Sequence, residues 1–253
     1  LRRQHQANMG LIHVRKDLLD KLDLKAPETW DQYVDYLKKC SASEKISGVV
    51  FTAKSGFPST ALNANLGAYG IPMRGWVKKA DGNFEFWAVQ PEVANALKQW
   101  RALVADGLVD PAVWEMDGDT ARTAYVSGKA CSFNFNGGGH IGRIQNDMTL
   151  VNKDFNEWVL PALDFGTGKR GYTQEDMFWG GTLIGNGKKN NPVAAARVIN
   201  YLISPEGEKL TAIGIEGRDY KMDGDKVVWL DQRFKDGFPT EALDAGAHPL
   251  ASG

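Results

Sequence analysis

One glycine-rich segment of the sequence has the spacing of a dinucleotide-binding motif. Gly137, Gly139 and Gly142 form the pattern G-x-G-x-x-G directly after a predicted strand, and Asp164 follows about 20 residues later. The motif lies in the middle of the chain, however, and Asn146-Asp147 is predicted to interrupt the helix that should follow it. A nucleotide-dependent oxidoreductase is therefore a minor alternative. We favour the interpretation that these glycines let the backbone approach a ligand or a neighbouring strand closely.

The acidic pair Glu175 and Asp176, next to Phe178 and Trp179, could indicate glycoside hydrolysis. That chemistry needs two carboxylates that face each other across the scissile bond. Residues adjacent in a strand point to opposite sides, so this pair cannot flank one substrate by itself. A carbohydrate-active enzyme, either a glycoside hydrolase or a lyase, stays open as an alternative. No nucleophile elbow, zinc-protease or P-loop pattern occurs, and we predict no catalytic residue, no metal site and no cofactor.

The aromatic residues point instead to sugar binding. The chain has eight tryptophans and 10% aromatic residues, several of them beside glycine, asparagine or proline. Aromatic rings next to amides suit sugars, because the C–H faces of a sugar stack on rings while its hydroxyls need hydrogen bonds. Trp179 stands out, since it lies between Phe178 and Gly180-Gly181 and the backbone there can approach a ligand closely. Most of the other aromatic residues are expected in the core.

The composition excludes several classes of protein. With 253 residues, 43% of them hydrophobic, the chain is large enough to bury one or two cores. The formal net charge is −1, so we expect no nucleic-acid partner. No apolar run reaches the ~18 residues of a membrane span, and the first residues lack the apolar stretch of a signal peptide. Cys40 and Cys131 form no metal-binding pattern, and we predict no structural disulfide, with two thiols that are unpaired or only incidentally paired.

Hydrophobic periodicity predicts alternating strands and helices, which indicates an α/β fold. Thr29 and Gln32 form a capping-box pattern at the start of one helix, and Asp81-Gly82 predicts a hairpin turn. The predicted strands cover residues 9–14, 47–52, 130–135, 157–161 and 181–185, and the predicted helices 15–22, 30–41, 60–69, 91–107, 119–128 and 192–203, with another that opens at 205.

Five short motifs stand in an order that resembles a known family. They are GLIHVRKDLL from residue 10, PETWD from 27, GLVDP from 107, SGKA from 127 and NPVAAA from 191, which leads to SPEG at 204. In this order they resemble the extracellular solute-binding proteins of the maltose-binding type. The segment GIEGRDY from residue 214, with DGD at 223, resembles the larger oligosaccharide-binding lipoproteins of Gram-positive bacteria.

The resemblance implies a periplasmic-binding-protein type II fold, in which two α/β lobes close on a sugar in a ligand cleft. The family's opening segments have no counterpart here, so we expect the first lobe to be incomplete in this chain. We expect residues 1–150 to form most of the second lobe, residues 151–205 the return segment of the first lobe, and residues 206–253 the remaining part of the second. The implied function is that of the substrate-binding component of an ABC importer, a monomer that delivers a sugar or oligosaccharide to the permease subunits. Its implied location is extracellular, lipid-anchored or periplasmic.

The resemblance also implies binding residues. Phe57 matches an aromatic residue that stacks on sugar. Asn136, together with Gly137 and the glycines after it, matches the loop after the SGKA strand, where glycine and His140 stand in place of a common family aromatic. Phe178 and Trp179 match a cleft-facing segment of the other lobe. The predicted ligand-binding residues are thus Phe57, Asn136, Gly137, His140, Phe178 and Trp179.

Overall fold

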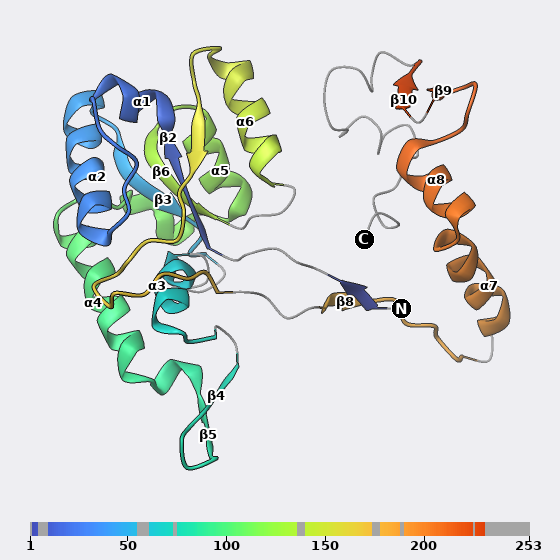
Figure 1. The fold of residues 1–253 in the computed structure, drawn as a ribbon, viewed down its shortest axis with the longest axis horizontal. Helices are drawn as coiled ribbons and strands as arrows, with labels where there is room; N and C mark the ends of the chain where they lie inside the picture. Colours follow the sequence, from blue (N-terminus) through green and yellow to red (C-terminus); the bar gives the residue numbers. More distant parts are fainter. Residues whose placement is uncertain are drawn as a thin grey trace. The chain divides into compact units, whose positions relative to one another are not determined.

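The chain forms two compact units (Figure 1). A computed structural model describes residues 2–4, 10–54, 61–72, 75–135, 140–173, 178–187, 190–224 and 226–230. Unit 2 is Gln6–Asp176, and unit 1 combines Leu1–His5 with Met177–Gly253. The polypeptide therefore passes between the units twice. No helix in the described part of the chain has the length and apolarity needed to cross a membrane.

Unit 2 is built on a four-stranded mixed sheet in the order β3-β6-β2-β7. Strand β3 is parallel to β6, whereas β2 is antiparallel to both β6 and β7. The ends of β3, β6 and β7 and the beginning of β2 consequently share one edge of the sheet, which we call the carboxyl edge. The strands are β2 (Leu11–Arg15), β3 (Ser47–Phe51), β6 (Ala130–Phe135) and β7 (Glu157–Val159).

Helices cover both faces of this sheet. Figure 1 shows α2 on one side of the strands and α5 and α6 on the other, with α3 close to the carboxyl edge. A separate hairpin, β4 with β5, projects from unit 2. These elements are α1 (Lys16–Lys21), α2 (Trp30–Glu44), α3 (Ala61–Tyr69), β4 (Trp76–Lys78), β5 (Phe84–Phe86), the 3-10 turns η1 (Trp87–Val89) and η2 (Pro111–Glu115), α4 (Pro91–Ala105), α5 (Gly118–Val126) and α6 (His140–Val151).

Local sequence signals explain several boundaries. The predicted capping box is confirmed, because the Gln32 backbone N–H donates to Thr29 Oγ1 at 3.3 Å and the Thr29 N–H donates to Gln32 Oε1 at 3.3 Å. The predicted interruption of the helix at Asn146-Asp147 is wrong, since α6 continues to Val151. The tertiary contacts of the helix outweigh the weak helix propensity of these two residues.

The described residues of unit 1 form a two-stranded ladder, two helices and a hairpin. Strand β1 (Arg2–Gln4) pairs antiparallel with β8 (Phe178–Gly181). The strand predicted over residues 181–185 is therefore misplaced, because it ends where it was expected to begin. Two helices follow, each opened by an asparagine or serine N-cap and a proline, and a hairpin comes after them. They are α7 (Pro192–Leu202), α8 (Pro205–Ile213), β9 (Tyr220–Asp223) and β10 (Lys226–Trp229).

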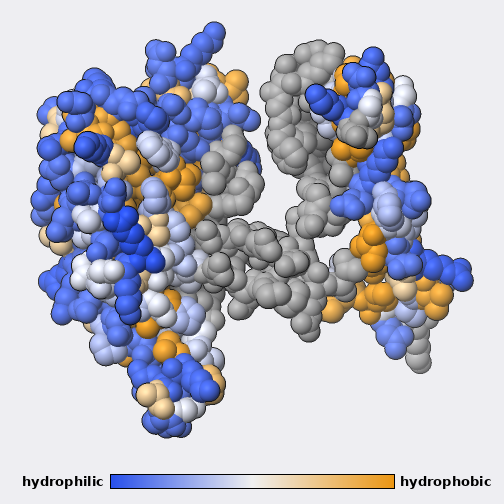
Figure 2. Space-filling model, viewed as in Figure 1, coloured by the Kyte–Doolittle hydropathy of each residue, from blue (hydrophilic) through white to orange (hydrophobic). Residues whose placement is uncertain are grey.

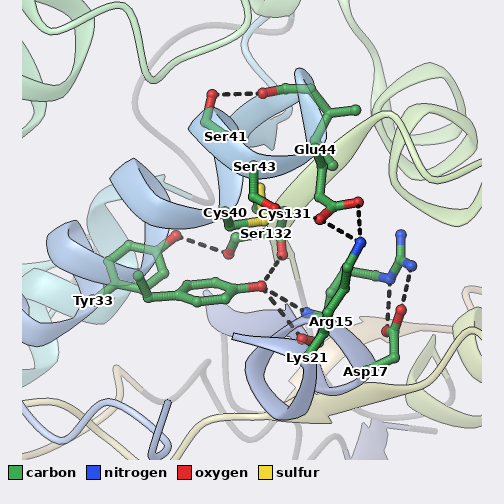
Figure 3. Close-up of a disulfide and its surroundings, with 12 residues drawn as sticks. Arg15, Asp17, Lys21, Tyr33, Cys40, Ser41, Ser43, Glu44, Cys131 and Ser132 are labelled. Atoms are coloured by element: carbon green, nitrogen blue, oxygen red, sulfur yellow. Dashed lines mark hydrogen bonds and ion pairs between the residues drawn. A yellow bond between two sulfur atoms is a disulfide. The ribbon is translucent and has the colours of Figure 1, made fainter. Parts of the chain in front are cut away.

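The two cysteines are joined in a disulfide, so the prediction of no structural disulfide is wrong. Cys40 on α2 and Cys131 on β6 have Cα atoms 6.2 Å apart, although 91 residues separate them in the sequence. Figure 3 shows the bond between them, and both residues are fully buried. Helix α2 packs on β6 at this point, where the Tyr36 hydroxyl donates to the Cys131 carbonyl oxygen at 2.8 Å. Only the packing of helix on sheet brings the two thiols together.

The boundary between the units also differs from the sequence-based boundary at residue 150. Strand β7 belongs to the sheet of unit 2, and Leu160, Leu163 and Phe165 lie in the core of that unit. Unit 2 extends to Asp176. The assignment of chain segments to two lobes of a binding protein stays a prediction.

Candidate ligand-binding site

Two strands that precede predicted binding segments end side by side at the carboxyl edge of the sheet. Strands β3 and β6 are parallel neighbours, and Phe51 at the end of β3 pairs with Asn134 near the end of β6. The two strands therefore end at adjacent points, and Phe57 follows the first in sequence while Asn136 and Gly137 follow the second. In α/β sheets, ligands bind outside the carboxyl ends of the strands. The three predicted residues themselves lie outside the described residues.

Aromatic side chains line this edge. Phe51 is buried, and its ring centroid lies 5.2 Å from that of Trp100 on α4 and 6.3 Å from that of Trp114 on η2. Trp114 is 46% exposed, so its ring connects this aromatic cluster to solvent. Trp114 was not among the residues predicted from the sequence, although its position just after the GLVDP motif was an available signal.

An apolar cavity of about 350 Å³ opens between α4 and η2. Its walls offer aromatic and aliphatic surface and a single charged residue, Arg101. Such a cavity can accept an apolar group, but it provides few hydrogen bonds for hydroxyls. The lining residues are Phe51, Leu97, Trp100, Arg101, Val104 and Trp114.

Buried polar groups without a protein partner lie near the same edge. Thr52 Oγ1, Asn134 Nδ2 and both amide atoms of Asn63 make no hydrogen bond. Asn63 is in the first turn of α3, where its backbone carbonyl accepts from Thr173 Oγ1 at 2.8 Å. Each unsatisfied buried group costs about 1–3 kcal/mol. Because these atoms are buried, an enclosed water is the partner that could satisfy them.

A tyrosine holds one of these amides in place. The Tyr33 hydroxyl lies 2.8 Å from Ser132 Oγ and donates to Asn134 Oδ1 at 3.4 Å. Burial raises the pKa of Tyr33 well above its ordinary value, so the hydroxyl stays protonated and keeps its donor. The contact fixes the orientation of the Asn134 side chain and leaves its Nδ2 as the free donor.

The described residues offer little for metal or acid–base chemistry. No group of three or more histidine, cysteine, aspartate or glutamate side chains in the described ranges could hold a metal ion. A buried histidine–carboxylate contact, His13 Nδ1 to Glu157 Oε2 at 2.9 Å, joins the central part of β2 to β7. His13 and its partner are almost completely inaccessible, so this pair cannot reach a substrate in solvent.

The remaining predicted site residues fall at two places. His140 is the first residue of α6, and its side chain lies outside the described part. Phe178 and Trp179 are on β8 of unit 1, where Phe178 pairs with Gln4 and the next pair joins Gly180 to Arg3. The register shift leaves Trp179 unpaired in the ladder, which is a β-bulge. Bulges are frequent next to active sites and redirect side chains there.

The sequence matches one protein family over most of its length. The family is described as "Bacterial extracellular solute-binding protein", and the match covers residues 4–209.

Three solved structures show a similar fold. The alginate-binding protein AlgQ2 without calcium ion has a TM-score of 0.66 at 14% identity and covers 89% of this chain and 47% of its own. FusA of S. pneumoniae in complex with kestose has a TM-score of 0.62 at 19% identity, with 89% and 48% covered. Maltose-bound T. maritima MalE3 has a TM-score of 0.56 at 23% identity, with 85% and 53% covered.

These likenesses establish the fold class. The predicted α/β fold of the periplasmic-binding-protein type II class is confirmed. The chain spans about half the length of the proteins that it matches.

Proposed function

Because this chain belongs to the bacterial extracellular solute-binding protein family, we propose that it is the substrate-binding component of an ABC importer and that its ligand is a sugar or an oligosaccharide. The observation that carries the proposal is the family match over residues 4–209. The sugar class is supported by the names of the similar structures, which include an alginate-binding protein, a maltose complex and a kestose complex. The aromatic and amide groups at the carboxyl edge are the groups that recognise sugars.

The ligand binds in a cleft between two lobes, as the family resemblance implies. In this proposal, one set of contacts comes from the residues that follow β3 and β6 in sequence, and the other, as the family resemblance implies, comes from Phe178 and Trp179. The aromatic residues stack on sugar rings, and the amide and backbone groups bond to hydroxyls. The proposed ligand-binding residues are Phe57, Asn136, Gly137, His140, Phe178 and Trp179.

Delivery rather than catalysis is the proposed outcome of binding. The protein acts as a monomer outside the cytoplasmic membrane, lipid-anchored or periplasmic, and hands its ligand to the permease subunits. The Cys40–Cys131 disulfide supports this location, because structural disulfides form in oxidising compartments outside the cytosol. Light scattering should give the mass of one chain in solution.

Calorimetry with a panel of sugars tests the proposal. The panel contains maltose, maltotriose, kestose and alginate oligosaccharides, with mannitol as a control polyol. Saturable binding of at least one sugar is expected, together with no new reducing ends after long incubation. Release of reducing ends would instead identify a carbohydrate-active enzyme, and copurified NAD would identify an oxidoreductase that uses Gly137, Gly139 and Gly142.

A further inference from the structure

The β4–β5 hairpin of unit 2 keeps large aromatic side chains in water. Trp76 and Phe84 are 64% and 61% exposed, and Phe86 is 45% exposed. Figure 2 shows apolar residues on the surface of this hairpin among its hydrophilic neighbours. Neighbouring exposed apolar side chains of this size mark interaction sites on proteins that are otherwise polar at the surface.

The strand register places these rings on one face. Trp76 pairs with Phe86, and Lys78 pairs with Phe84. Because side chains alternate along a strand, all four lie on the same side of the hairpin. Val77, on the opposite side, is partly buried and packs against the core of unit 2. The aromatic side is therefore turned away from the core.

Hairpin stability explains only part of this arrangement. The ring centroids of Trp76 and Phe86 are 5.7 Å apart in an edge-on contact, and such cross-strand pairs stabilise a hairpin. Phe84 has no aromatic partner among the described residues, since it stands opposite Lys78. A residue that served only the hairpin would not need to be a phenylalanine there.

We propose that this outward face, formed by Trp76, Lys78, Phe84 and Phe86, is a second carbohydrate-binding surface that stacks on the C–H faces of sugar rings in a polysaccharide. The inference rests on the proposed function, because it assumes that the ligands of this protein are sugars. The three rings are exposed to solvent, so a sugar chain can reach them. Lys78 beside the rings supplies hydrogen-bond donors for hydroxyl or carboxylate groups.

Two other kinds of partner fit the hairpin less well. A membrane-inserting hairpin needs an apolar tip, whereas the tip carries Lys79, Asp81 and Asn83, with Asp81 Oδ1 accepting from the Asn83 N–H at 3.0 Å. A stable protein interface buries roughly 800 Å² on each partner. Three aromatic side chains on a two-stranded ribbon provide less than that.

Affinity electrophoresis in gels that contain amylopectin, inulin or alginate tests the proposal. The variant is Trp76→Ala/Phe84→Ala, and the matched control is Trp158→Ala, which removes a tryptophan on β7 that is 44% exposed. The wild type should be retarded by at least one polysaccharide. The double variant should show an apparent Kd about tenfold higher, while Trp158→Ala and the conservative Trp76→Phe retain the wild-type value. Equal melting temperatures exclude unfolding as the cause.

The remaining outcomes separate this inference from the proposed function. If the wild type binds short sugars in calorimetry and the double variant migrates like the wild type in every gel, the hairpin inference is overturned and the proposed function stands. If the wild type binds neither short sugars nor polysaccharides, both fall together. Equal loss of retardation in Trp158→Ala would show nonspecific adhesion and overturn the inference. A vesicle assay tests for a membrane contact. If the wild type cosediments with phosphatidylcholine–phosphatidylglycerol vesicles and the double variant does not, while both migrate alike in the gels, the face binds a membrane and the inference is overturned.

Discussion

Helix α4 of unit 2 and helix α7 of unit 1 have similar sequence signals and very different surroundings. Both begin with a proline at the first helical position and carry an apolar stripe with helical spacing. Helix α4 buries Val93, Ala96, Trp100 and Leu103. No residue of α7 is buried. Figure 2 shows apolar residues on the surface of α7 and α8.

The periodicity of apolar residues therefore specifies a helix and its apolar side, but it does not specify which element packs on that side. Helix α4 packs on α3 and, through Trp100, on Phe51 of the sheet. Helix α7 packs mainly on α8, where Gly207 approaches the backbone of Tyr201 so closely that a Cβ would lie 1.9 Å from its carbonyl oxygen. Most helical stability in proteins comes from tertiary packing of an apolar face. The two units should therefore respond differently to the same kind of truncation.

The largest effect is expected from Trp100→Ala in α4. Trp100 is 2% exposed, and its Nε1 donates to Asn65 Oδ1 at 2.9 Å. The cavity should lower the free energy of unfolding by about 3–5 kcal/mol, which urea denaturation followed by circular dichroism measures. Leu97→Ala on the exposed side of the same helix is the control, with an expected loss below about 1 kcal/mol. Equal losses in the two variants would contradict the packing described for α4.

Removal of the disulfide comes next. The Cys40→Ser/Cys131→Ser variant should lose about 2–5 kcal/mol of stability, because a cross-link over this length of chain restricts the unfolded state of unit 2. Wild-type protein that is denatured, reduced and then refolded in reductant should have a urea midpoint close to that of the variant. Detection of two free thiols in the unreduced, denatured wild type would show that the disulfide does not form.

Trp179→Ala should affect binding more than stability. Stacking on sugar should contribute on the order of 1 kcal/mol or more. We expect sugar affinity to fall about tenfold, which corresponds to ~1.4 kcal/mol, with an almost unchanged melting temperature. Calorimetry and differential scanning fluorimetry measure the two quantities. A large loss of thermal stability with intact affinity would make Trp179 a core residue and remove it from the site.

The smallest effect is expected from Val198→Ala in α7. Val198 is 57% exposed, so truncation should change the free energy of unfolding by less than about 0.5 kcal/mol. Thermal or urea denaturation of the whole chain measures this loss. Val93→Ala in α4 is the buried counterpart, and its loss should be larger. A loss above about 1.5 kcal/mol would mean that another surface covers α7 in solution, and the contrast between the two helices would then disappear.

The sequence predicted the parts of the fold that short-range interactions determine. The strand that ends at Phe135, the capping box at Thr29 and the hairpin around Asp81-Gly82 depend on residues only a few positions apart. The order of five motifs over most of the chain pointed to the family that the comparison confirms. Alternation, caps and turn residues are local, so one-dimensional patterns record them.

For the candidate site, the sequence indicated segments rather than an arrangement. It drew attention to the loops after two strands and to the segment around Trp179. It did not show that β3 and β6 are parallel neighbours or that Trp179 lies in a bulge. Trp114 was missed although it follows the GLVDP motif, and Asn63 was missed because an unpartnered buried amide has no signature in sequence.

Only the tertiary structure decided the disulfide, the boundary at Asp176 and the burial of each helix. Cys40 and Cys131 meet because α2 packs on β6 across 91 residues of sequence. Residues 157–173 belong to unit 2 because β7 pairs with β2 and three apolar side chains after it enter the core. Such contacts depend on which surfaces exclude water together. That is a property of the assembled layers, which the pattern of a single segment does not contain.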